Sequence, residues 1–389
     1  MSKSQVRQFL VARQQLQDPA PENPREIVRT LECIQLDPVA LIGRNQDLVL
    51  GARLQQPTSG ILDGLLSQGD LIEYEANAAS IMPIEDVLWM KGIQVRMRHA
   101  LQAQLDSLGA VVDDVMGRLA REGPLPASAF TSPERVTGYW DSEAVTKATS
   151  HALNLLRDVG VIRVVARKGG QRFFDLMERG IKRSLLDDWH TITVEEADRG
   201  LLQKYLRAYA IVDARDPRFG WQRQRAADRK RQIEQLVHTR LLTPLTIEGV
   251  AQPYYVITES LDLLEQFRGA CEPPAESAPI RFLPPLDNLL WRRERLEDIF
   301  DYTYRWEIYT PESKRKYGAY VMPILAGSTL VGRFNARCVR ETDTLQVIGI
   351  WWEPWFKPTR TFRDQLLAAL ANFSRQLGMR QFDLLLPLA

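Results

Sequence analysis

An amide and a carboxylate stand two residues apart near the N-terminus, in the stretch Ile34-Gln35-Leu36-Asp37-Pro38-Val39. Proline disfavours the α conformation in the residue before it, so Pro38 predicts that Asp37 lies on extended or turning backbone. Side chains two apart on an extended backbone point to the same side. Gln35 and Asp37 could therefore share one water molecule. The same pattern also suits a turn or a capping acid, and the spacing alone leaves both interpretations open.

Basic residues interleaved with aromatic residues form two clusters in the second half of the chain. The first runs from Arg215 to Arg231, with seven basic residues against two acidic ones, and includes Trp221. The second is Lys314-Arg315-Lys316-Tyr317, close in sequence to Trp306 and Tyr309. Cations suit contacts to phosphate and aromatic rings suit stacking on bases, so both clusters are candidates for nucleic-acid contact. Each taken alone could also be a solvated helix face or a charged loop.

The residues before the Gln35–Asp37 pair predict a helix. Asn23 can cap it, Pro24 fits the first helical position, and Glu26 stands where a capping-box acid belongs. We expect this helix to run to about Cys33, directly before the pair.

The second segment, 111–190, shows a helix followed by a hairpin. Asp141 or Ser142 can cap a long helix that Gly160 terminates. The two β-rich runs that follow flank a Lys168-Gly169-Gly170 turn, which predicts a hairpin. A long helix followed by a hairpin is the element order of a winged-helix domain.

The third segment, 191–268, repeats this order without repeating residue identities. We expect one helix over roughly 194–210 and a second after Gly220. Two strands should then flank a Glu248-Gly249 turn. A repeat of element order is weaker evidence than a repeat of sequence.

Residues 269–285 contain five prolines and are the best candidate for a domain boundary. Beyond them the pattern turns to strands, with a helix from Phe362 to Leu377 that repeats apolar residues at helical spacing. The last residues, 380–388, resemble a closing strand. We therefore expect an α+β fold, in which tandem winged-helix domains precede a C-terminal β-barrel-like domain or curled sheet.

Composition narrows the class of protein. Of the 389 residues, 45% are apolar and 25% are charged, which is ordinary for a globular chain. At about 100–200 residues per domain, this length suggests two or three domains. The 50 basic and 49 acidic residues leave a net charge of +1, so any basic surface must be local. The absence of GxGxxG, GxxxxGK[ST] and GxSxG argues against nucleotide-dependent enzymes and serine hydrolases.

The metal-ligating residue types are scattered. Cys33, Cys271 and Cys338 form no CxxC pair and the histidines are isolated, so we expect no disulfide framework, metal or cofactor. No run approaches the ~18 apolar residues of a membrane span, and the first residues lack the apolar core of a secretory signal. We expect a monomer in the reducing cytoplasm, without membrane association.

Four stretches of the chain resemble the AlkZ/YcaQ-type DNA glycosylases, a family also described as winged-helix DNA-binding proteins. The first is IQLDPV, the family's Gln-apolar-Asp motif in its YcaQ-like form, and the second is EYEANAASIMPIED. The others are residues 138–180 and 282–334, of which the last is the longest and most specific. The resemblance implies three winged-helix units followed by a β-barrel, which fits segments at 1–110, 111–190, 191–268 and 280–389.

The chain departs from this family in the EYEANAAS stretch. The family more usually has Trp and His where this sequence has Glu75 and Asn77. If that histidine contacts DNA or supports the active site, this chain should differ in rate or substrate.

The activity that the resemblance implies is excision of N7-alkylated purines from double-stranded DNA, including bulky or cross-linked adducts. Asp37 as a carboxylate can accept a proton from water and stabilise a cationic sugar. With an ordinary pKa near ~3.9 it would be ionised at neutral pH. Gln35 can orient the water. No lysine stands out for Schiff-base chemistry, which favours a monofunctional glycosylase.

A non-catalytic winged-helix protein, such as a transcription regulator, is the alternative. It would keep the basic helices and hairpins but have no use for Gln35 and Asp37. In both cases the expected partner is DNA. The residues expected to contact it are Lys147, Arg167, Lys168, Arg223, Arg225, Lys314, Arg315, Lys316 and Tyr317.

Overall fold

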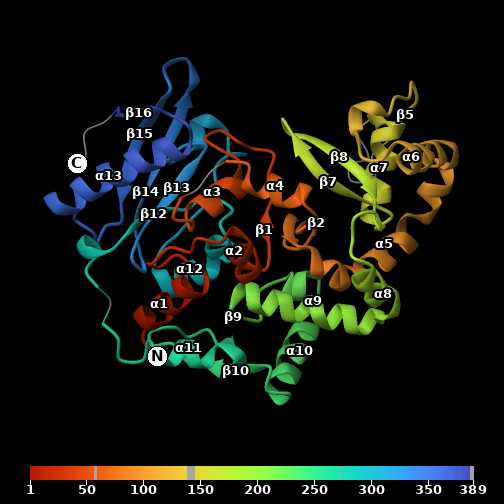
Figure 1. Cartoon of the computed structure of the whole chain (residues 1–389). Coiled ribbons are helices and arrows are strands. Elements are labelled where there is room, and N and C mark those ends of the chain that lie inside the picture. Colours follow the sequence, from red (N-terminus) through yellow and green to blue (C-terminus); the bar gives the residue numbers. More distant parts are fainter. Residues whose placement is uncertain (57–58, 138–144, 272, 386–389) are drawn as a thin grey trace. The chain divides into compact units, whose positions relative to one another are not determined.

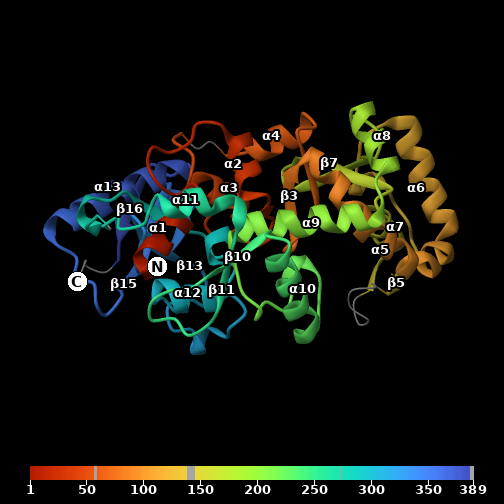
Figure 2. The ribbon, with the colours of Figure 1, turned by 90° about the horizontal axis from the view of Figure 1, so that it is seen from below.

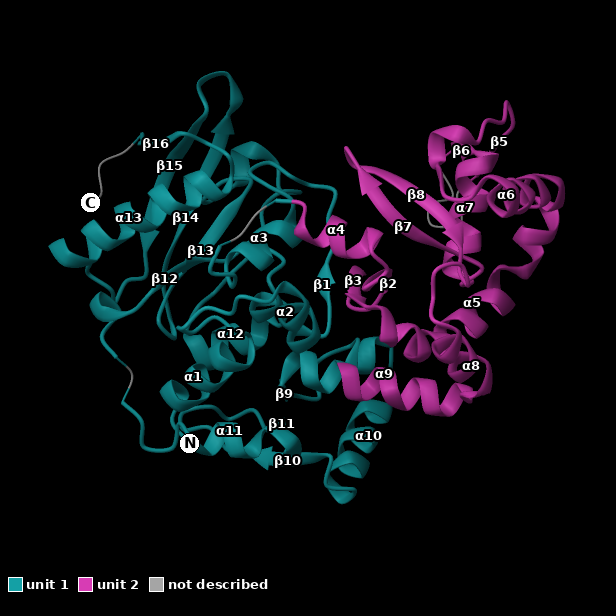
Figure 3. Cartoon of the chain, in the orientation of Figure 1, with its two compact units in different colours: residues 1–59, 205–389 teal, residues 60–204 magenta. Residues whose placement is uncertain are grey.

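A computed structural model describes residues 1–56, 59–137, 145–271 and 273–385 (Figures 1 and 2). The chain folds into two compact units (Figure 3). Unit 1 comprises Met1–Ser59 and Tyr205–Ala389, and unit 2 comprises Gly60–Lys204. The long helix α9 (Val194–Tyr209) begins in unit 2 and ends in unit 1.

The C-terminal half of unit 1 is a five-stranded sheet in the order β12-β13-β14-β15-β16. Its first four strands are antiparallel, and β16 pairs parallel with β15. Irregular pairing in β13–β14 and β14–β15 bends these strands. The strands are β12 (Ile280–Phe282), β13 (Val321–Ala326), β14 (Thr329–Val339), β15 (Thr344–Trp352) and β16 (Gln381–Leu384).

Helix α13 (Arg360–Gln376) covers one face of this sheet, as both ribbon views show (Figures 1 and 2). Phe362, Leu366 and Leu370 of this helix belong to the same buried core as the strands. The expected curled sheet with a helix and a late strand is confirmed. In the described part of the chain β12 and β16 are edges, so the sheet is open rather than a closed barrel.

The N-terminal part of unit 1 places the Gln35–Asp37 segment between two helices. Asn23 caps the first of them by accepting a hydrogen bond from the Arg25 N–H at 3.0 Å. The expected helix start is therefore confirmed, although the helix ends at Leu31. The elements are α1 (Lys3–Arg13), α2 (Pro24–Leu31), β1 (Ile34–Gln35) and α3 (Asn45–Gly51).

The middle of unit 1 follows the order expected for the third segment. Helix α9 is followed by a second helix and a pair of antiparallel strands, in a sheet of order β10-β11-β9. The elements after α9 are β9 (Ile211–Val212), α10 (Ala226–His238), β10 (Leu242–Leu245), β11 (Tyr254–Ile257), α11 (Leu261–Glu265) and α12 (Arg293–Phe300).

Unit 2 holds the hairpin predicted for the second segment, in which strands β7 and β8 are joined by a tight turn. Gly169 and Gly170 have φ of +54° and +80°, a conformation that glycine adopts without a Cβ penalty. The expected hairpin is confirmed. The helices before α9 are α4 (Ile61–Ser67), α5 (Val87–Ser107), α6 (Gly109–Glu122), α7 (Ala148–Asp158) and α8 (Arg183–Thr191). The strands are β2 (Leu71–Glu75), β3 (Ala79–Pro83), β4 (Leu125–Pro126), β5 (Arg135–Thr137), β6 (Val145–Lys147), β7 (Ile162–Lys168) and β8 (Gln171–Leu176).

The expected start of the long helix in this unit was wrong. Asp141 and Ser142 lie outside the described residues, but Val145–Lys147 form β6, which pairs with β5. Helix α7 therefore begins only at Ala148. Valine and threonine favour extended backbone, and cross-strand pairing outweighs their place in a helical pattern.

The four expected domain segments stay predictions. A compact unit can contain more than one winged-helix domain, so the two units do not test boundaries drawn from element order. The proline-rich residues 269–285 lie within unit 1. None of the helices in the described ranges combines the length and the hydropathy needed to cross a membrane.

Candidate active site

Two buried asparagines fix the backbone that leads to Asp37. Asn288 donates to the carbonyl of Cys33 at 2.8 Å, and Asn45 donates to the carbonyl of Gln35 at 2.8 Å. Both asparagines are 1% exposed. Hydrogen bonds from buried amide groups replace water at the carbonyls of an irregular segment. The backbone is therefore held at Cys33 by the short 3-10 helix Asn288–Leu290 and at Gln35 by α3.

Asp37 lies half-buried in the turn after β1. Its Oδ1 accepts the Val39 N–H at 2.8 Å, the local bond that Asp forms in turns. Burial raises the pKa of Asp37 above 3.8, and the Val39 N–H opposes that rise. The pKa of Asp37 is therefore higher than the ordinary value that the sequence led us to expect, because desolvation disfavours the charged form.

Three aromatic side chains form a row from the interior of unit 1 to its surface, and the innermost one is affected by the charge of Asp37. Tyr320 is 2% exposed, and burial, Tyr304 and the charge of Asp37 together raise its pKa. Within the described ranges its hydroxyl has no hydrogen-bond partner. The Trp306 ring lies 6.1 Å from that of Tyr320 and 6.0 Å from that of Tyr309, edge to face in both pairs. Sequence reasoning noted Trp306 and Tyr309 only as neighbours of a basic cluster and missed Tyr320.

The segment between α12 and β13, which we call the 301–318 loop, is tied down by its own side chains. The Glu307 carboxylate accepts the backbone N–H groups of Lys316, Tyr317 and Gly318 at 2.9 to 3.2 Å. These bonds lower the pKa of Glu307 against the opposing effect of burial. A carboxylate that accepts several N–H groups fixes the loop around it.

The four expected DNA-contact residues of this loop differ in their surroundings. Lys314 and Lys316 are exposed. Arg315 donates to the Thr310 carbonyl at 2.8 Å and to the Ile308 carbonyl at 3.4 Å. The half-buried Tyr317 ring lies 5.3 Å from that of Trp351. The lysines are thus the side chains of this group that face solvent.

The Arg215–Arg231 cluster divides between fold and surface. Arg215 pairs with Asp213 at 3.0 Å and with Asp298 at 2.6 Å. Arg229 is buried and donates to the carbonyl of Gln224 at 2.6 Å. The expected contacts Arg223 and Arg225 are exposed, and Arg225 pairs with Asp228 at 2.8 Å.

Unit 2 carries the other expected DNA contacts. Lys147 precedes α7 and is exposed, as is Lys168 at the tip of β7. Arg167 pairs with Glu73 through two bonds, the second at 2.8 Å. Its charge is therefore partly neutralised within the unit.

The residues that depart from the family pattern lie where β2 turns into β3. Glu75 is exposed at the end of β2, and Asn77 is half-buried in the turn. Asp158 is buried in the same unit, and burial followed by the charge of Glu75 raises its pKa to about 7. The acidic residue at 75 thus contributes to the raised pKa of Asp158.

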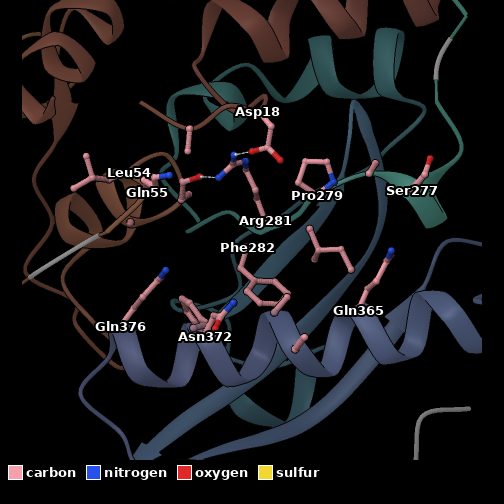
Figure 4. Close-up of a pocket in the computed structure, with 18 residues that line it drawn as sticks. Asp18, Leu54, Gln55, Ser277, Pro279, Arg281, Phe282, Gln365, Asn372 and Gln376 are labelled. Carbon is pink, nitrogen blue, oxygen red and sulfur yellow. Dashed lines mark hydrogen bonds and ion pairs between the residues drawn. The ribbon is translucent and has the colours of Figure 1, made fainter. Parts of the chain in front are cut away.

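A separate pocket of about 550 Å³ opens in unit 1 between α13 and the start of β12 (Figure 4). Arg281 points across it to Asp18, at 2.7 Å, and also donates to the carbonyls of Leu16 and Ala52. These hydrogen bonds engage the Arg281 guanidinium within the fold. Gln35 and Asp37 are not among the residues that line this pocket. Across the described ranges, no group of three or more His, Cys, Asp or Glu side chains could hold a metal ion.

The chain belongs to the AlkZ-like DNA glycosylase family, whose model matches residues 28–375. That range includes Gln35, Asp37 and the 301–318 loop. The structure of Streptomyces sahachiroi DNA glycosylase AlkZ is similar, with a TM-score of 0.62 and 16% sequence identity over 99% of each chain. At this identity the likeness concerns the fold.

Proposed function

We propose that the protein is a monofunctional DNA glycosylase that releases cationic N7-alkylated purines from double-stranded DNA, bulky and cross-linked adducts included. The observation that carries this proposal is the Gln35–Asp37 pair, held by buried asparagines inside the family match. A transcription regulator with the same basic surfaces would not need this pair.

The proposed reaction needs a base and a placed water but no acid. Alkylation at N7 leaves the purine cationic, so the C1′–N9 bond breaks with its electron pair going to a base that departs neutral. Water attacks C1′ and gives its proton to the Asp37 carboxylate, which also stabilises the cationic sugar. Gln35 orients the water through its amide. Partial burial of Asp37 strengthens its electrostatic effect on the sugar.

DNA binding is proposed to use tandem winged-helix units and to need one copy of the chain. The hairpins β7–β8 and β10–β11, each following a helix, support that architecture. The proposed contacts are the nine residues expected from the sequence, of which the exposed lysines at 147, 168, 314 and 316 are the best placed.

The test uses three duplexes, carrying N7-methylguanine, an N7–N7 interstrand cross-link, or uracil. We expect abasic sites in the first, unhooking of the second and little release from the third, because neutral uracil lacks an activated leaving group. Borohydride should trap no protein–DNA adduct, since no Schiff base forms. Asp37→Asn, treated identically, corrects for spontaneous depurination.

Each possible failure has a distinct meaning. Tight DNA binding without release from any duplex would favour a transcription regulator. Robust uracil release, or methylguanine release without unhooking, would indicate a closed pocket that encloses a flipped base. A borohydride-trapped adduct would contradict the monofunctional mechanism.

A further inference from the structure

Tyr309 is an aromatic side chain that the fold presents to solvent. It is 82% exposed, more than any other exposed large hydrophobic residue in the described part of the chain. Single exposed apolar residues are common and need no explanation by themselves. Tyr309 differs because two further observations concern its position.

The first observation is that the backbone on both sides of Tyr309 is braced. The Arg315 guanidinium donates to the carbonyls of Ile308 and Thr310, which flank Tyr309. The Thr310 N–H in turn donates to the Glu307 carbonyl at 2.9 Å. An exposed ring on a held backbone loses little conformational freedom when it binds, which favours contact with a partner.

The second observation is the row of rings that runs inward from Tyr309. Trp306 contacts Tyr309 on one side and Tyr320 on the other. Tyr320 is close enough to Asp37 for the carboxylate charge to affect its hydroxyl. The exposed ring is thus the outer end of a packed row whose inner end is Tyr320, and the charge of Asp37 helps to raise the pKa of that tyrosine.

The neighbouring charges indicate what such a ring would contact. Lys314 and Lys316 are exposed on the same loop. The Lys316 ammonium lies 4.8 Å from the centre of the Tyr317 ring, and neither lysine forms an ion pair in the described residues. Cations that can reach phosphates beside an exposed aromatic ring are the elements of a nucleobase-stacking site. A surface for a protein partner more often shows a wider exposed apolar patch.

We propose that Tyr309 is a base-stacking residue, whose ring packs against a nucleobase next to the lesion while Lys314 and Lys316 contact the adjoining phosphates. The position of the lesion beside Asp37 rests on the proposed function. The stacking itself does not require base release, so the two ideas can fail separately.

The experiment uses a duplex with 2-aminopurine beside a tetrahydrofuran abasic analogue, which no glycosylase can process. Stacking on Tyr309 should change 2-aminopurine fluorescence on binding. Tyr309→Ala should remove that change and weaken binding by about 5- to 150-fold. Tyr309→Phe keeps the ring and should stay within about twofold of wild type.

Trp355→Ala is the matched control, because Trp355 is a second exposed aromatic residue of unit 1, at 53% exposure. It should bind like wild type, and thermal unfolding should confirm that all variants are folded. An unchanged Kd and fluorescence in Tyr309→Ala would overturn the proposal. Equal losses in Tyr309→Ala and Tyr309→Phe would overturn it too, since the hydroxyl rather than the ring would then act. Failure of wild type to release N7-methylguanine would contradict the glycosylase activity and leave the stacking result standing.

Discussion

Two regions of unit 1 carry clustered charges but use them differently. In the Asp213–Arg231 segment, Arg215 is engaged by two aspartates and Arg229 by backbone carbonyls. In the second region, formed by Asp37 and the 301–318 loop, no ion pair joins Asp37, Lys314 or Lys316 to another described residue.

The difference lies in the partners rather than in the density of charge. A cation held by buried carboxylates stabilises the fold and has few donors left for a ligand. A charge without an ion partner is free to bind a phosphate, a cationic sugar or a proton. Substitutions of Asp37, Lys314 or Lys316 should therefore change function with little loss of stability, and substitutions of Arg215 or Arg229 should do the reverse.

The largest effect should come from Asp37→Asn. Loss of the base should lower single-turnover release of N7-methylguanine by roughly 10²- to 10⁴-fold, to the level of spontaneous depurination. DNA affinity should stay nearly unchanged. Thermal unfolding should show no loss of stability, because the change removes a partly buried charge whose ionised form burial disfavours.

Gln35→Ala tests the second residue of the pair and should have a smaller effect than Asp37→Asn. It should slow release less than Asp37→Asn, since placing the water is only part of the barrier. If Asp37→Asn released the base at the wild-type rate, Asp37 would not be the base of the reaction. The contrast between a functional and a structural region would then lose its functional member.

Local signals in the sequence predicted most elements of the fold. The Gly169-Gly170 turn and the Asn23 cap depend on neighbouring residues, and both are present. The late start of α7 at Ala148 was not predictable, because it depends on pairing between Val145–Lys147 and a strand about ten residues earlier.

The next largest effect should be the loss of stability in Arg215→Ala. The guanidinium is one-third exposed but bonds Asp213, Asp298 and the Tyr254 hydroxyl, and its removal leaves the buried Asp213 with fewer donors. We expect the free energy of unfolding to fall by roughly 1.5–3 kcal/mol in urea titrations.

Arg225→Ala is the control, since Arg225 is an exposed residue of the same segment. Its exposed ion pair should contribute less than about 1 kcal/mol. If Arg215→Ala unfolds like wild type but binds DNA weakly, this arginine is a DNA contact and the comparison fails.

The third effect is on the salt dependence of DNA binding. The double variant Lys314→Glu, Lys316→Glu should make the negative slope of log K against log salt shallower by about 1.8, which corresponds to two lost phosphate contacts. Adding Arg315→Glu should weaken binding further, through loss of the bonds to Ile308 and Thr310 as well as of charge. An unchanged slope in the double variant would mean that these lysines face away from DNA.

The candidate site was only partly accessible from the sequence. Gln35 and Asp37 were found through spacing and family resemblance, and their roles stay predictions. Asn288 holds the Cys33 backbone before the pair, and Tyr320 has its pKa raised in part by the charge of Asp37. Both lie more than 250 residues further along the chain, so no local pattern connects them to the pair. The two basic clusters also could not be ranked, because Asp298, which engages Arg215, lies 83 residues further along the chain.

The smallest expected effect is on the pH dependence of base release, and it compares two aspartates directly. Burial raises the pKa of Asp37, whereas the hydrogen bond from Arg225 lowers that of Asp228. The proposed base must be ionised, and a raised pKa keeps it protonated to higher pH. Release should therefore decline with falling pH at an apparent pKa above 3.8, the ordinary value. Single-turnover rates with the Asp37→Asn background subtracted give this value, and carboxyl NMR titration should place Asp228 below 3.8. An acid limb at or below 3.8 would show that a cation reaches Asp37 in the DNA complex, and its charge would then be paired during catalysis.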